Sequence, residues 1–75
     1  MDQSLKKLGE DRRSAIMEFL RGYREERGYS PTQAEIARHL GVSVTCVQRH
    51  VRILTSQGDL TFEAGAARTL VPVDA

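Results

Sequence analysis

A chain of 75 residues with a net charge of +1 supports one small domain, with a core near the minimum size for independent folding. The near-zero charge excludes a uniformly basic protein, so any nucleic-acid surface must be a local patch. The single cysteine excludes an internal disulfide framework and indicates a reducing compartment, for which we expect the cytoplasm. We expect no membrane association, because residues 1–13 lack a signal-peptide core and no apolar run is long enough to span a bilayer.

The first predicted element is an amphipathic helix from about Glu10 to Arg27. Apolar side chains recur along it at the spacing of one helix face, which predicts a helix that supports the core. This face comprises Ile16, Phe19, Leu20 and Tyr23. Gly28 is placed to end the helix. Residues 1–9 are expected to form an N-terminal extension to a domain over residues 10–75, and the sequence leaves open whether this extension continues the helix.

A second helix is predicted to begin at Thr32, after an extended connector that ends in Pro31. Glu35 stands three residues after Thr32. This is the spacing of a capping box, in which each side chain satisfies a free backbone N–H group at the helix start. The start of a helix also carries partial positive charge, so Thr32 and Gln33 are candidate contacts to a DNA phosphate.

The strongest functional signal lies in residues 32–58, which have the pattern of a helix-turn-helix. Ala37 is small enough to let the next helix pack closely, Gly41 stands at the turn, and Val47 faces inward on the following helix. The second helix of such a unit enters the DNA major groove. The pattern therefore predicts a DNA-binding domain.

The third helix is predicted over about residues 44–56, with two opposite faces. Its expected buried seam comprises Val44, Val47, Val51 and Leu54. No acidic residue lies between Val42 and Gly58, whereas a structural surface helix often pairs Glu with Lys. This bias favours a nucleic-acid surface over a merely solvated one.

The exposed side chains of this helix suit contacts to DNA. Arginine can donate two parallel hydrogen bonds to guanine, glutamine can pair with adenine, and hydroxyl groups can bond to either base edge. Base contacts are expected near the helix start, from Ser43, Thr45, Gln48 and Arg49. Arg52, further along, is expected to bind phosphate.

After Gly58 the apolar pattern changes to a period of two, which predicts strands. The alternation runs through Leu60, Phe62 and Ala64. Residues 65–67 are predicted to form a turn and residues 68–73 a second strand, with Pro72 acceptable at an edge. Two such strands make a wing, and Arg68 near its tip is either a phosphate contact or a solvated charge. The predicted fold class is mainly α, a three-helix winged helix-turn-helix with a two-stranded antiparallel wing.

The stretch from about Ile16 to Val73 resembles the N-terminal DNA-binding domain of LexA-type repressors. The residues that carry the resemblance are Gly28 to Thr32, Ala34 to Ala37, Leu40, Gly41, His50, Val51, Leu54, Gly58 and Gly65 to Arg68. It implies a winged helix-turn-helix that binds operators as a dimer and represses transcription. The positions that contact bases in the family correspond here to Ser43, Thr45, Cys46, Gln48 and Arg49.

Three departures limit what this resemblance implies. The turn at residues 42–44 is one residue shorter than in the family, which leaves the register of the recognition helix open. The base-contacting side chains are not the LexA set, so the same operator is not expected. The self-cleaving domain, with its Ser–Lys pair and main dimer contacts, is not in this sequence. Ala64-Gly65 lies inside the predicted wing and is not expected to be a cleavage site.

The predicted function is sequence-specific binding of double-stranded DNA by a transcriptional regulator of the repressor type. The expected operator is an inverted repeat, with a weak homodimer contact or a second protein on the adjacent half-site. The alternative is a winged-helix interaction module that acts on another regulator or on a polymerase. No catalytic residue, metal or cofactor is expected, because His39, Cys46 and His50 lack metal-ligand spacing. A redox role for Cys46 stays open, although a small apolar role fits it better.

Overall fold

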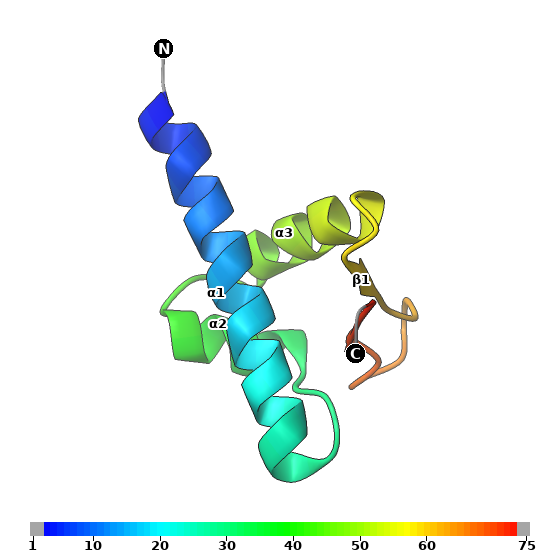
Figure 1. Cartoon of the computed structure of the whole chain (residues 1–75). Coiled ribbons are helices and arrows are strands. Elements are labelled where there is room, and N and C mark those ends of the chain that lie inside the picture. Colours follow the sequence, from blue (N-terminus) through cyan, green and yellow to red (C-terminus); the bar gives the residue numbers. More distant parts are fainter. Residues whose placement is uncertain (1–2, 74–75) are drawn as a thin grey trace.

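The computed structural model describes residues 3–73 as three helices and a two-stranded antiparallel sheet (Figure 1). The elements in chain order are α1 (Gln3–Arg27), α2 (Gln33–Leu40), α3 (Val44–Ser56), β1 (Leu60–Thr61) and β2 (Val71–Pro72). This order confirms the predicted fold class, a winged helix-turn-helix. Among these helices, none has an apolar stretch that could cross a membrane.

Helix α1 begins at Gln3, ahead of the start expected near Glu10, so the described part of the N-terminal extension continues the helix, as one of the two open alternatives had it. Its early residues, such as Lys6 and Leu8, are good helix formers, and no proline or β-branched residue interrupts them. Figure 1 shows the first turns of α1 extending past the other helices. The division of the chain into an extension over residues 1–9 and a domain over 10–75 stays a prediction.

The core lies where the three helices meet, and the wing strands close it. It is built from aliphatic side chains and one methionine, as the scarcity of aromatic residues requires. Its buried members are Ile16, Met17, Leu20, Ile36, Ala37, Val47, Val51, Leu54, Leu60 and Leu70. Phe19 and Phe62 are only partly buried against this cluster. The predicted inner face of the first helix is thus correct in position, but it also includes Met17.

Local caps hold the helix-turn-helix in place. The Thr32 hydroxyl accepts a hydrogen bond from Glu35 N at 3.1 Å, and Glu35 Oε1 accepts one from Thr32 N at 2.8 Å, which confirms the capping box. Gly41 ends α2 with a φ of 71°, a left-handed conformation that favours glycine. Its N–H group donates to the carbonyl oxygen of Ala37. These contacts fix the angle at which α3 leaves α2.

The buried seam of α3 differs from the predicted one at its first position. Val47, Val51 and Leu54 are buried, but Val44 is 40% exposed because it starts the helix beyond the edge of the core. His50 takes the fourth place and is only 8% exposed. The seam is therefore turned toward α1.

The wing strands are shorter than predicted. Leu60 pairs with Pro72 and Thr61 with Val71, and no longer ladder is present between the described residues. Where longer strands were expected, the chain forms a turn that is closed by the side chain of Thr69. Glu63 N donates to Thr69 Oγ1 at 2.9 Å, and Thr69 Oγ1 donates to the carbonyl oxygen of Glu63 at 3.2 Å. Arg68 has a φ of 61°, which is incompatible with an extended strand.

Candidate nucleic-acid interface

The outer face of α3 carries exposed polar and basic side chains opposite its buried seam. Thr45, Arg49 and Arg52 follow one another at spacings of four and three residues, so they lie on one side of the helix. Gln48 is also exposed and lies on the flank of this face. The structure thus brings together four of the predicted DNA contacts on a surface free of acidic side chains from α3 itself.

Ser43 stands directly before this face, at the start of α3. It is the N-cap residue, and its hydroxyl oxygen accepts a hydrogen bond from Cys46 N at 3.1 Å. The hydroxyl proton is left to donate to an acceptor on a base or phosphate. The cap therefore fixes Ser43 at the point where α3 would first meet DNA.

Cys46 lies apart from the other predicted base contacts. It is half-buried on the flank of α3 that faces α1, and Arg12 Nη1 donates to its sulfur at 3.6 Å. On the same flank, Arg13 Nη1 lies 3.3 Å from His50 Nδ1. Because arginine can only donate, His50 Nδ1 must accept. This contact helps to pack α3 against α1.

The pKa of His50 is lowered from its ordinary value of 6.5, first by burial and then by the charges of Arg13, Arg12 and Arg49. A neutral imidazole matches the acceptor role of its Nδ1 atom. Three guanidinium groups from two helices therefore act on one flank of the recognition helix. The sequence pattern does not reveal this convergence, because Arg12 and Arg13 belong to another element.

The start of α2 meets α3 and the wing across a cleft of about 230 Å³. Thr32, Gln33 and Gln48 line it together with residues 65–70 of the wing. Gln33 Oε1 is buried there and has no hydrogen-bond partner within the described part of the chain. The two predicted phosphate contacts on α2 thus lie next to the Gln48 flank of α3.

Arg68 folds back onto the start of α2 instead of extending from the wing. Its Nη1 lies 3.0 Å from Glu35 Oε1 and its Nη2 lies 3.2 Å from Glu35 Oε2, a two-point ion pair. The same Nη1 donates to the carbonyl oxygen of Ser30 at 3.0 Å, and the guanidinium lies over the Tyr29 ring. A DNA phosphate would have to compete with Glu35 for this arginine.

The Glu35 carboxylate is a functional group that the sequence pattern shows only in part. Its pKa is lowered to about 2, first by the hydrogen bond from Thr32 N and then by Arg68. The spacing from Thr32 predicts the capping role, but nothing local predicts the partner on the wing. Glu35 therefore both caps α2 and holds the wing in place through Arg68.

The family model described as the LexA DNA binding domain matches residues 5–69. The chain belongs to the LexA DNA-binding domain family. The match confirms the resemblance inferred from the sequence.

Several curated relatives of this LexA-family domain are named LexA repressors. The protein from Cellvibrio japonicus is 38% identical over 58 residues, which are 76% of this chain and 29% of that protein. The one from Halorhodospira halophila is 39% identical over 66 residues, which are 87% of this chain and 29% of that protein. LexA repressor 2 of Geobacter sulfurreducens is 40% identical over 58 residues, 76% of this chain and 29% of that protein. The chain thus spans 29% of the length of these three relatives.

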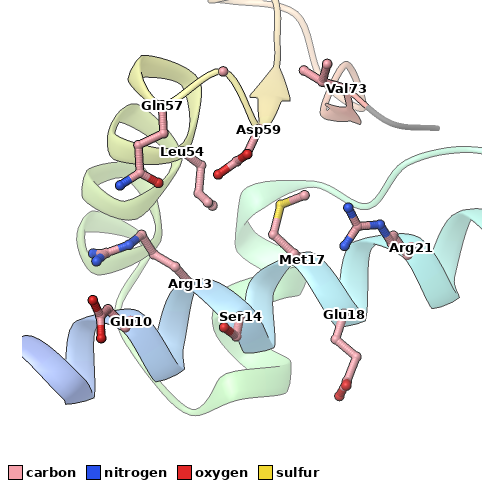
Figure 2. Close-up of a pocket in the computed structure, with 11 residues that line it drawn as sticks. Glu10, Arg13, Ser14, Met17, Glu18, Arg21, Leu54, Gln57, Asp59 and Val73 are labelled. Carbon is pink, nitrogen blue, oxygen red and sulfur yellow. The ribbon is translucent and has the colours of Figure 1, made fainter.

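A second groove of this LexA-family domain lies between α1 and the end of α3, away from the cleft beside α2. It encloses about 700 Å³, and Figure 2 shows basic and acidic side chains around it, among them Arg13, Glu10 and Asp59. This mixture of charges does not favour a polyanion. Within residues 3–73, no three His, Cys, Asp or Glu side chains are grouped to hold a metal ion.

Proposed function

We propose that this domain binds double-stranded DNA sequence-specifically and represses transcription, with α3 in the major groove. The observation that carries the proposal is the exposed Thr45–Arg49–Arg52 face of α3, the second helix of the capped helix-turn-helix. Membership of the LexA DNA-binding domain family and the repressor names of the relatives support it. Covering a promoter is sufficient for repression, so no catalytic role or cofactor is proposed.

The proposed contacts follow the geometry of the two flanks of α3. Ser43, Thr45, Gln48 and Arg49 would meet base edges near the helix start, with Arg52 on phosphate further along. Thr32 and Gln33 would hold a phosphate at the start of α2, where backbone N–H groups and amide protons can donate. Cys46 stays a proposed contact at the flank near α1. Arg68 stays a proposed phosphate contact only if DNA displaces it from Glu35.

We propose an inverted-repeat operator as the partner, and the cytoplasm as the compartment. Two copies of the domain, or one copy and a second protein, would occupy adjacent half-sites. Because one small module buries on the order of 600–1,000 Å² on DNA, selectivity among many sites requires a second module.

Selection of bound duplexes from a random pool tests the proposal, followed by fluorescence anisotropy with a selected duplex and a scrambled one. We expect an enriched motif and weaker binding to the scrambled duplex by at least about tenfold. Arg38→Ala, on the exposed side of α2, is the matched control and should leave the motif unchanged. A pool without enrichment contradicts sequence-specific binding. Absence of binding even at low salt would instead favour the protein-interaction alternative.

A further inference from the structure

The first half of α1 passes alongside the flank of α3 that carries Cys46 and His50. Arg12 contacts the Cys46 sulfur at 3.6 Å, and Arg13 contacts His50 Nδ1 at 3.3 Å. At Gly9, α1 is so close that a Cβ atom would lie 3.9 Å from a ring carbon of His50. Beyond this crossing the helix continues toward its N-terminus past the rest of the domain (Figure 1).

The two flanks of α3 have different neighbours. The Gln48 flank faces the start of α2 and the wing across their shared cleft. The Cys46 flank faces α1. A helix in the major groove lies between two phosphate backbones, since the groove is about 12 Å wide. If α3 occupies the groove as proposed above, one backbone must run past the Gln48 flank and the other past the Cys46 flank.

The side of α1 that faces the Cys46 flank is positively charged. Arg12 contacts a thiol and Arg13 contacts a neutral imidazole. Among residues 3–73, neither arginine has its charge balanced by an ion pair. Arg68 differs, because Glu35 neutralises it. Lys6 precedes Arg13 by seven residues, which places it on the same side of α1, and its side chain is exposed.

Arg12 is the central residue of this set. It contacts Cys46, in the first turn of α3, where Thr45 is also exposed; Arg49 is exposed one turn further along. Arg13 shares the mixed-charge groove of Figure 2 with Glu10, so part of its field is offset. A phosphate beside the start of α3 would therefore meet Arg12 first.

We infer that Arg12, together with Lys6 and Arg13, binds the DNA backbone on the wall of the major groove that lies away from the wing. This inference rests on the proposed function and names a contact surface outside the helix-turn-helix. It makes α1 a DNA-binding element as well as a scaffold. The domain would then contact both walls of the groove that α3 enters.

Salt titrations of duplex binding test the inference with the full chain. Arg12→Gln and Lys6→Gln should each weaken binding to selected and scrambled duplexes by a similar factor, roughly twofold to tenfold. Each should also make the plot of log affinity against log salt shallower by about 0.9. Arg12→Lys should retain the slope, and Arg38→Gln, which removes one charge from the exposed side of α2, should change neither quantity.

Unchanged affinity and slope in a folded Arg12→Gln variant, while the unaltered chain binds DNA, would overturn only the α1 contact and leave the proposed function standing. If the unaltered chain binds no duplex, both fail. Ethylation interference on the unaltered chain gives a second test that needs no substitution. Modified phosphates on both walls of the groove should block binding, and interference confined to the wing-side wall would overturn the inference.

Discussion

We expect the exposed residues of α3 to divide into base contacts and phosphate contacts by their place on the helix. Arg49 lies on the outer face one turn after Thr45, in the first half of α3. Its planar group can donate two hydrogen bonds to guanine. Arg52 lies further along the helix, so we expect it to contact the DNA backbone instead.

We predict that Arg49→Ala costs about 1–3 kcal/mol on the selected site and removes base preference at one position of the motif. Binding to scrambled DNA should change little by comparison. Anisotropy titrations against a panel of single-base variants of the motif measure both effects. Equal losses on every duplex would show instead that Arg49 contacts phosphate.

We predict that Arg68 positions the wing as long as it is paired with Glu35. Arg68→Ala should release the wing from α2 and lower DNA affinity on the order of tenfold or less, without changing the salt slope. Arg68→Lys should not restore affinity, because lysine cannot reproduce the two-point ion pair with Glu35. The effects of Arg68→Ala and Glu35→Gln should be non-additive in a double-mutant cycle.

If Arg68 instead contacts a phosphate, as the sequence suggested, the same experiments should give the opposite result. The salt slope would then fall by about 0.9, and Arg68→Lys would recover most of the affinity. Anisotropy at a series of salt concentrations therefore separates the two roles of one side chain.

At the scale of elements, the helices whose ends depend on neighbouring residues were predicted well. Thr32 with Glu35 marks the start of α2, Gly41 marks its end, and α3 has the predicted bounds. Local hydrogen bonds decide these positions, so a short stretch of sequence contains the information. The sequence left the start of α1 open because no such cap marks it.

The wing and the α1 flank were predicted less well because distant residues determine them. The alternation through Phe62 suggests longer strands, but Thr69 closes the turn and Arg68 reaches Glu35, 33 residues away. In the same way, contact with Arg12 and Arg13 decides that Cys46 and His50 face α1. Periodicity alone carries no information about such partners.

The junction of α1 and α3 should make stability depend on pH. The pKa of His50 is lowered in the folded state, whereas in the unfolded chain it returns to about 6.5. Below pH 6.5 the unfolded chain therefore binds a proton that the folded chain resists. Stability should be constant above this range and fall as the pH decreases through it.

Urea unfolding on either side of pH 6.5 measures this effect. His50→Gln should reduce the loss of unfolding free energy, and His39→Gln, at an exposed position of α2, is the control. Glu35 does not interfere, because its pKa is lowered to about 2 and its contribution is lost only as the pH falls below 4.5. If the His50→Gln variant loses as much unfolding free energy at low pH, the effect comes from another titrating group.

At the scale of the whole molecule, the recognition helix has supporting elements on both sides. The start of α2 and the wing lie on one flank, and α1 lies on the other. The balance of charge over the chain leaves no broad attractive field, so binding must come from these local contacts.

We predict that the free protein is monomeric or weakly dimeric and pairs only on DNA. The exposed large apolar side chains of the described residues are Leu8, Tyr29, Val44 and Val73, which come from separate parts of the chain rather than from one stable dimer face. On an inverted repeat with half-sites about one helical turn apart, two copies should bind with greater affinity and selectivity than one copy on a single half-site.

Analytical ultracentrifugation with and without a two-half-site duplex measures this pairing. We expect one copy per particle without DNA and two copies per duplex with it. A duplex in which half a helical turn is inserted between the half-sites is the control, since it places the second copy on the opposite side of the DNA. Equal affinity for this control, for the single half-site and for the repeat would show that the domain acts alone.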